Sequence, residues 1–170
     1  LKAKPRVQLL GSGTILREVE AAAALLEQDW DVAADVWSAT SFTELRRDGL
    51  AAERWNLLHP EDKPKQAYVT QCLEKRAGPV VAASDYMKAF ADQIRPFVPR
   101  DRVYKVLGTD GFGRSDSRAK LRHFFEVNRY FIAIAALKAL AETGEAKAKT
   151  VSEAIKKYGI DPNKPDPTTV

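Results

Sequence analysis

Four short apolar runs, each followed by apolar residues at helical spacing, constrain the fold of this chain more than any other feature. The run Pro79–Ala83 is apolar throughout, as is typical of a central strand in a parallel sheet covered on both faces. Parallel strands need long crossover connections, which are usually helices. The alternation predicts a three-layer α/β/α fold, doubly wound around a mainly parallel sheet. The predicted strands are Val7–Leu10, Val32–Trp37, Pro79–Ala83 and Val103–Leu107.

The expected helices carry recognisable start signals. Ser41 with Glu44, and Thr150 with Glu153, form S/T-x-x-E capping boxes, which satisfy free backbone N–H groups at a helix start. Asn128 is expected to cap the next helix in the same way.

Three further features of the helical segments give expectations. Gly49 is expected to interrupt the helix that begins near Phe42, because glycine disfavours a helix interior. Asp85 is expected to cap the helix that follows it. The segment Arg129–Glu142 is apolar over so wide an arc that it needs cover on more than one side.

The length and composition fit one domain. A chain of 170 residues with 45% hydrophobic residues can bury a substantial core. We expect one α/β domain over residues 1–160 and a proline-rich tail with no core to join over residues 161–170. Because the chain begins at Leu1 and enters a strand almost at once, we expect it to be a fragment of a longer protein.

The charge pattern and cysteine content exclude several classes of function. The formal charge is +4, but the charges alternate along the chain, so we expect no nucleic-acid partner. No apolar run approaches the ~20 residues of a membrane span, so we expect no membrane association. Cys72 is the single cysteine, which fits a reducing, cytoplasmic location.

Common catalytic motifs are incomplete. The turn Gly11–Gly13 lacks the third glycine of a dinucleotide-binding loop, since Leu16 stands there. His59 and His123 lie in no zinc-binding motif. Ser115 lies in no nucleophile elbow, and we expect no catalytic triad.

The best functional candidate is a glycine-rich loop that follows the fourth strand. Gly108, Gly111 and Gly113 break the strand, and a helical pattern resumes at Leu121. Open α/β sheets place their binding sites in such loops, at the carboxyl ends of the strands. The candidate contact residues are Asp110, Arg114, Ser115, Asp116, Arg118 and His123.

Two interpretations of this charged loop stay open. Arg114 and Arg118 near a helix start could bind an anion or a partner's carboxylate. Alternatively, they pair with Asp110 and Asp116 in an internal network that fixes the loop and a subunit contact, which the balanced charges favour. Ser115 or Asp116 is then expected to cap the following helix.

The amino-acid sequence of this loop resembles that of a known family. GTDGFGRSDSR, followed by LRHFFEV, is similar to the C-terminal domain of the decarboxylating first component of the pyruvate dehydrogenase complex, in its homodimeric bacterial form. Three other segments resemble the same family and occur in the same order along the chain: VQLLGSGTILREV, DVWSATSFTELRRDGLAAERWNLLHP and AASDYMKAFADQIRPFVP. The resemblance extends from about Val7 to about Ile160 and is much more specific than a single glycine pattern.

The resemblance implies a complete enzyme that decarboxylates pyruvate on thiamine diphosphate and Mg²⁺ and passes the acetyl group to a lipoyl group of dihydrolipoyl acetyltransferase. Its implied partners are that acetyltransferase, the other domains of the same polypeptide and a second subunit. The family's catalytic residues lie in the other domains. This domain is then scaffold and dimer contact, and the fragment alone is expected to be inactive. The family's antiparallel strand comes from residues before Val7, so we expect it to be missing.

We expect no catalytic, cofactor-binding or metal-binding residue in this chain. The sequence Gly108–Gly111 resembles the G-D-G signature of thiamine diphosphate enzymes, but Thr109 replaces a required glycine and the downstream asparagine is too near. Two alternatives to the proposed family role stay open: a stand-alone, non-catalytic α/β interaction module, and the same domain of another transketolase-type enzyme acting on a different 2-oxo acid.

Overall fold

The computed structural model describes residues 4–170 and contains a four-stranded parallel sheet in the order β2-β1-β3-β4. The two central strands, β1 and β3, are almost entirely buried. The antiparallel strand of the resembled family, which we expect to be missing, does not occur among the described residues. The strands are β1 (Arg6–Gly11), β2 (Ala33–Ser38), β3 (Val80–Ala83) and β4 (Tyr104–Leu107).

Helices cover both faces of the sheet, so the predicted three-layer α/β/α fold is confirmed. Alternate side chains of β1 and β3 enter opposite cores: Leu9 and Val81 face one, and Leu10 and Val80 face the other. The first core lies under α1 (Leu16–Trp30), α6 (Arg129–Glu142) and α7 (Ala148–Lys157). The second lies under α2 (Phe42–Leu58), α3 (Tyr68–Glu74), α4 (Lys88–Asp92) and the 3₁₀ helix η2 (Arg95–Phe97).

Helix α6 is covered on more than one side, as its wide apolar arc predicts. It packs against α1 and α7 as well as against β3 and β4. Its start is capped by Asn128, whose Oδ1 accepts hydrogen bonds from the backbone N–H groups of Tyr130 (3.1 Å) and Phe131 (3.2 Å). No helix within residues 4–170 is both long enough and apolar enough to cross a membrane.

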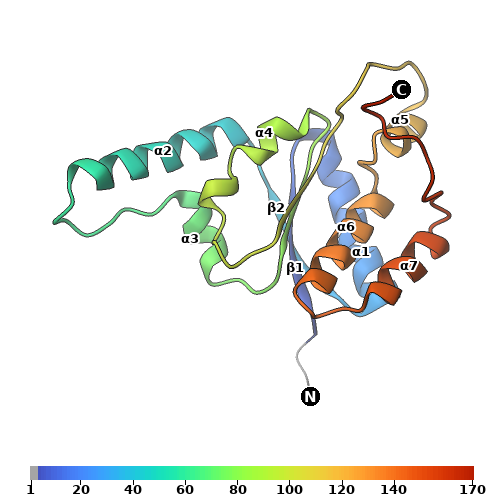
Figure 1. Cartoon of the computed structure of the whole chain (residues 1–170), viewed down its shortest axis with the longest axis horizontal. Coiled ribbons are helices and arrows are strands. Elements are labelled where there is room, and N and C mark those ends of the chain that lie inside the picture. The colour runs from blue at the N-terminus through green and yellow to red at the C-terminus, as the bar shows by residue number, and fades with distance from the viewer. Residues whose placement is uncertain (1–3) are drawn as a thin grey trace.

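The expected break of α2 at Gly49 is wrong, because the helix runs unbroken from Phe42 to Leu58. A Cβ on Gly49 would lie 2.6 Å from ring atoms of Phe97, so glycine at this position allows close packing of α2 on η2. The C-terminal part of α2 leaves the body of the molecule as a projecting arm (Figure 1).

Two of the expected caps are also wrong. Helix α7 begins at Ala148, two residues before Thr150, so the predicted capping box lies inside the helix. Asp85 does not cap α4, whose N-cap is Met87. It instead accepts a hydrogen bond from Thr14, because the adjacent loop after β1 brings a hydroxyl within reach. The cap at Ser41 is confirmed: its Oγ accepts from the Glu44 N–H at 3.2 Å.

The tail differs from the expectation that it has no core to join. Pro167 is buried, and its carbonyl group lies against Gly111 of the glycine-rich loop. Lys164 Nζ donates to Glu126 Oε1 at 3.0 Å and lies over the ring of Phe124. These contacts explain why a polar, proline-rich segment folds back onto the domain.

Candidate functional site

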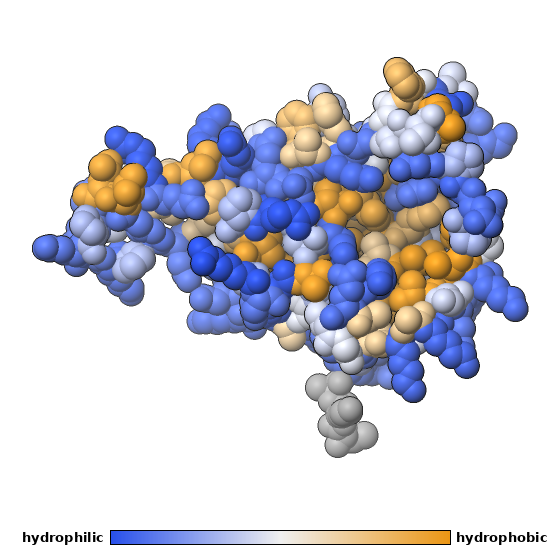
Figure 2. Space-filling model, in the orientation of Figure 1, coloured by the Kyte–Doolittle hydropathy of each residue, from blue (hydrophilic) through white to orange (hydrophobic). Residues whose placement is uncertain are grey.

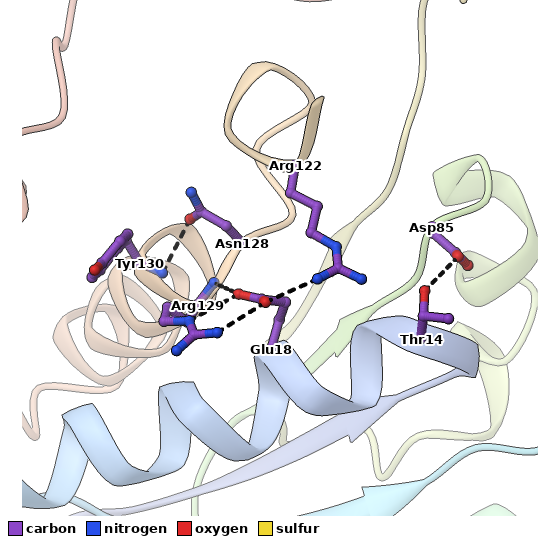
Figure 3. Close-up of polar contacts among 7 residues, drawn as sticks. All are labelled: Thr14, Glu18, Asp85, Arg122, Asn128, Arg129 and Tyr130. Carbon is purple, nitrogen blue, oxygen red and sulfur yellow. Dashed lines mark hydrogen bonds and ion pairs between the residues drawn. The ribbon is translucent and has the colours of Figure 1, made fainter. Parts of the chain in front are cut away.

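The candidate site lies at the carboxyl ends of β1 and β3, where the strand order reverses. In doubly wound folds this switch point is the usual position of a binding crevice. Two hydrogen bonds join the loops that follow the two strands. Ser12 Oγ donates to Ser84 Oγ at 3.1 Å. Thr14 Oγ1 donates to Asp85 Oδ2 at 3.0 Å (Figure 3). Thr14 belongs to the short 3₁₀ helix η1 (Gly13–Ile15) that precedes α1.

A cleft of about 530 Å³ opens above this point. The loop after β1, the loop after β3, the glycine-rich loop and α5 (Arg118–Phe124) form its walls. The polar side chains that line it are those of Thr14, Asp85, Thr109, Arg114, Asp116, Arg118 and Arg122.

The glycine-rich loop is fixed to the neighbouring loop by its first residues. Asp110 Oδ2 accepts a hydrogen bond from the backbone N–H of Lys88 at 3.0 Å. Thr109 Oγ1 donates to the carbonyl of Asp85 at 3.0 Å, and the Thr109 N–H donates to the carbonyl of Tyr86. Asp110 therefore contacts the start of α4 and not an arginine of its own loop.

The predicted ion-pair network among the loop residues does not form. Within residues 4–170, no salt bridge joins Asp110 or Asp116 to Arg114 or Arg118. Asp116 instead lies 3.7 Å from Lys120 Nζ, one helical turn away. These acidic groups have nearer partners, which is why the balanced charges do not pair.

The remaining loop candidates point in different directions. The guanidinium of Arg114 lies over the Phe124 ring at 4.5 Å, and His123 packs against Phe131 at 5.6 Å between ring centroids. Ser115 is exposed. The N-cap of α5 is Ser117, so neither Ser115 nor Asp116 occupies that position, although Asp116 Oδ1 accepts from the Ser117 N–H at 2.7 Å.

The main ion-pair cluster at this edge centres on Glu18, which the loop pattern did not indicate. Glu18 has a side chain only 8% exposed and lies on α1. Its carboxylate accepts from Arg122 Nη1 (3.1 Å) and from Arg129, through the backbone N–H (2.9 Å), Nε (3.0 Å) and Nη2 (3.1 Å) (Figure 3). Its sequence signal is weak: Glu18 lies four residues before the buried Ala22, on the apolar side of a predicted helix.

This cluster changes the acidity of its members. Burial alone would raise the pKa of Glu18, but hydrogen bonds from Arg129 and the positive charges of Arg129 and Arg122 outweigh burial and lower it. The hydrogen bond to Glu18 raises the pKa of Arg129. Glu18 is therefore ionised at neutral pH, and the cluster ties α1 to α5 and to the start of α6.

The residues of the site do not suit Mg²⁺ bound to the diphosphate of thiamine diphosphate. Mg²⁺ requires several oxygen ligands in octahedral geometry. Within residues 4–170 there is no group of three His, Cys, Asp or Glu side chains that could hold a metal ion. The carboxylate of Asp110 in the G-D-G-like stretch is occupied by the Lys88 N–H.

The fold defines a class of α/β domains that includes part of a transketolase. A solved structure described as "Split gene transketolase, inactive beta4 tetramer" superposes with a TM-score of 0.53, covering 82% of this chain and 41% of the other, at 17% sequence identity. That likeness concerns the fold alone. The chain belongs to the transketolase-like TK C-terminal domain family, whose sequence model matches residues 1–128.

Three curated relatives are similar over nearly the whole chain, and each is named pyruvate dehydrogenase E1 component. The protein of Pseudomonas aeruginosa is 65% identical over 166 residues, that of Cupriavidus necator 62% over 166 and that of Escherichia coli 54% over 164. The matches cover 96–98% of this chain but only 18–19% of those proteins. The chain thus spans about a fifth of the length of these relatives.

Proposed function

We propose that this chain is the C-terminal domain of a bacterial pyruvate dehydrogenase E1 component. The observation that carries the proposal is the 65% identity to the Pseudomonas aeruginosa protein of that name, over 98% of the chain. In this proposal the complete enzyme decarboxylates pyruvate and transfers the acetyl group to a lipoyl group of dihydrolipoyl acetyltransferase. It acts as a cytoplasmic homodimer within the multienzyme complex.

Within that enzyme, the chain serves as scaffold and dimer contact. Two features support this role: the closed cores on both sides of the sheet, and the projecting arm of α2, which has exposed apolar residues near its end. Thiamine diphosphate and Mg²⁺ would supply the decarboxylation chemistry in the complete enzyme. Because the residues of this chain do not suit that group, we assign no step of the reaction to them.

The test is to purify the protein as its organism produces it and to measure reductive acetylation of a lipoyl domain. We expect turnover that requires pyruvate, thiamine diphosphate and Mg²⁺ together. A parallel series with 2-oxoglutarate and branched 2-oxo acids serves as the control for substrate class. A higher kcat/KM for one of these acids than for pyruvate would contradict the proposal and favour a related transketolase-type enzyme.

A further inference from the structure

The cluster around Glu18 leaves a positive charge without a matching acid beside the cleft. One carboxylate is shared by two guanidinium groups, those of Arg122 and Arg129. The side chain of Arg122 is only 17% exposed, and its one hydrogen bond within residues 4–170 is from Nη1 to Glu18. A guanidinium has five N–H donors, so Arg122 retains donors beside the cleft that it lines.

Two further arginines lie around the same space. Arg118 stands one helical turn before Arg122 on α5, so the two lie on one face of that helix. Both line the cleft described above and an adjoining hollow of about 700 Å³, which Arg17 of α1 also lines. In the described part of the chain, no carboxylate oxygen lies within 4 Å of the charged nitrogens of Arg17 or Arg118.

The carboxylates that line these two spaces cancel this charge only in part. Asp85 is bonded to Thr14, and Asp116 is the partner of Lys120. Glu20 lines the adjoining hollow from the same helix as Arg17. Arg114, stacked on Phe124, adds a further cation to the lining of the cleft.

We propose that Arg17, Arg118 and Arg122 bind the phosphoryl group of a small organic phosphate. A tetrahedral dianion can accept from several guanidinium forks at once, which is why arginine clusters select phosphates. Arg118 and Arg122 line both the hollow, which Arg17 also lines, and the cleft. The cleft has a volume typical of small-ligand sites and lies at the switch point of the sheet. This site goes beyond the proposed function, since it involves neither the lipoyl partner nor the decarboxylation chemistry.

The test titrates the isotopically labelled chain with inorganic phosphate and, separately, with glycerol 3-phosphate, and follows the arginine Nε–H signals by NMR. Sodium chloride is exchanged for ligand so that ionic strength stays constant and general screening does not change. We expect saturable shifts confined to Arg17, Arg118 and Arg122. Tighter binding of glycerol 3-phosphate than of inorganic phosphate would support an organic phosphate as ligand. Equal affinity for the two would overturn that part of the proposal and would indicate inorganic phosphate as the ligand.

Matched variants separate a specific site from general attraction to a basic protein. Arg118→Gln should raise the Kd for phosphate by about tenfold, because it removes one fork of the site. Lys149→Gln removes the same charge from the exposed face of α7 and should leave the Kd unchanged. Shifts that do not saturate in the unmodified chain, or equal losses of affinity in the two variants, would overturn the site.

Discussion

At the scale of single residues, Gly111 and Gly113 form a matched pair in one loop. Gly111 has φ +110°, and a Cβ there would lie 2.2 Å from the carbonyl oxygen of Pro167. A Cβ on Gly113 would have no neighbour within 4 Å. Gly111→Ala should therefore lower the free energy of unfolding by about 1–3 kcal/mol, through backbone strain and displacement of the tail.

Urea unfolding of the two variants measures this difference. Gly113→Ala is the control and should change the free energy of unfolding by no more than about 0.5 kcal/mol. If both variants lose the same stability, the contact between the loop and the tail does not contribute to folding.

Glu18 is the second residue with a specific expected effect. Glu18→Gln removes the charge that holds Arg122 and Arg129, and should cost about 1–3 kcal/mol at pH 7. This is below the ~3–5 kcal/mol typical of fully buried pairs, because Arg129 is partly exposed. Glu20→Gln, on the exposed side of the same helix, is the control and should have little effect.

The effect of Glu18→Gln should also depend on pH. The folded pKa of Glu18 is lowered relative to an unfolded value of about 4.3. Its stabilising contribution is therefore complete above that value and is lost as the pH falls through the folded pKa. Denaturant unfolding at pH 7 and at about pH 3 should show the unmodified chain and the variant converging at the lower pH. A constant difference would contradict the role of the ionised carboxylate.

At the scale of elements, sequence patterns predicted the type and order of the strands and main helices, but not all of their ends. Alternation of strand and helix follows from local periodicity, which the sequence contains directly. The end of a helix depends also on tertiary contacts, as at Gly49, where packing on Phe97 favours glycine within a continuous helix. Glu18 was missed for the same reason, since its partners lie more than 100 residues away.

Two of the cap predictions in the C-terminal half, those at Asn128 and Thr150, differ in outcome and can be tested together. Asn128→Ala should lower the free energy of unfolding by about 0.5–2 kcal/mol, because α6 loses the acceptor for two N–H groups at its start. Thr150→Ala should have much less effect, because Thr150 lies inside α7. Thermal and urea unfolding measure both, and a larger loss for Thr150→Ala would show that this assignment of the α7 start is wrong.

At the scale of the whole molecule, the layered architecture was predictable because each layer must bury an apolar face. The projecting arm was not predictable from the sequence. Local patterns indicate a helix, but the exposure of its end depends on which other elements pack beside it. The arm is held in shape by its own contacts. The Asn56 side chain hydrogen-bonds both the N–H and the carbonyl of Lys65, at 2.8 and 2.9 Å, and Trp55 stacks on His59 at 4.4 Å.

The end of this ordered arm presents apolar side chains to solvent. Leu57 is 78% exposed and Leu58 is 55% exposed, and apolar atoms gather at the tip of α2 in Figure 2. Burying one leucine contributes about 1.5–3 kcal/mol, so two leucines at a rigid tip favour association between molecules. We therefore expect the chain to self-associate reversibly at high concentration, through the arm.

Sedimentation velocity over a concentration series tests this expectation. Leu57→Ser should weaken self-association by about tenfold or more, since ~1.4 kcal/mol corresponds to a factor of ten. Phe112→Ser is the matched control, because Phe112 is 76% exposed but lies on the glycine-rich loop and not on the arm. Equal weakening by both changes would mean that general surface hydrophobicity drives association. If the chain stays a monomer at all concentrations, the expected self-association through the arm is wrong. The arm would then need other parts of the complete enzyme to form the proposed dimer contact.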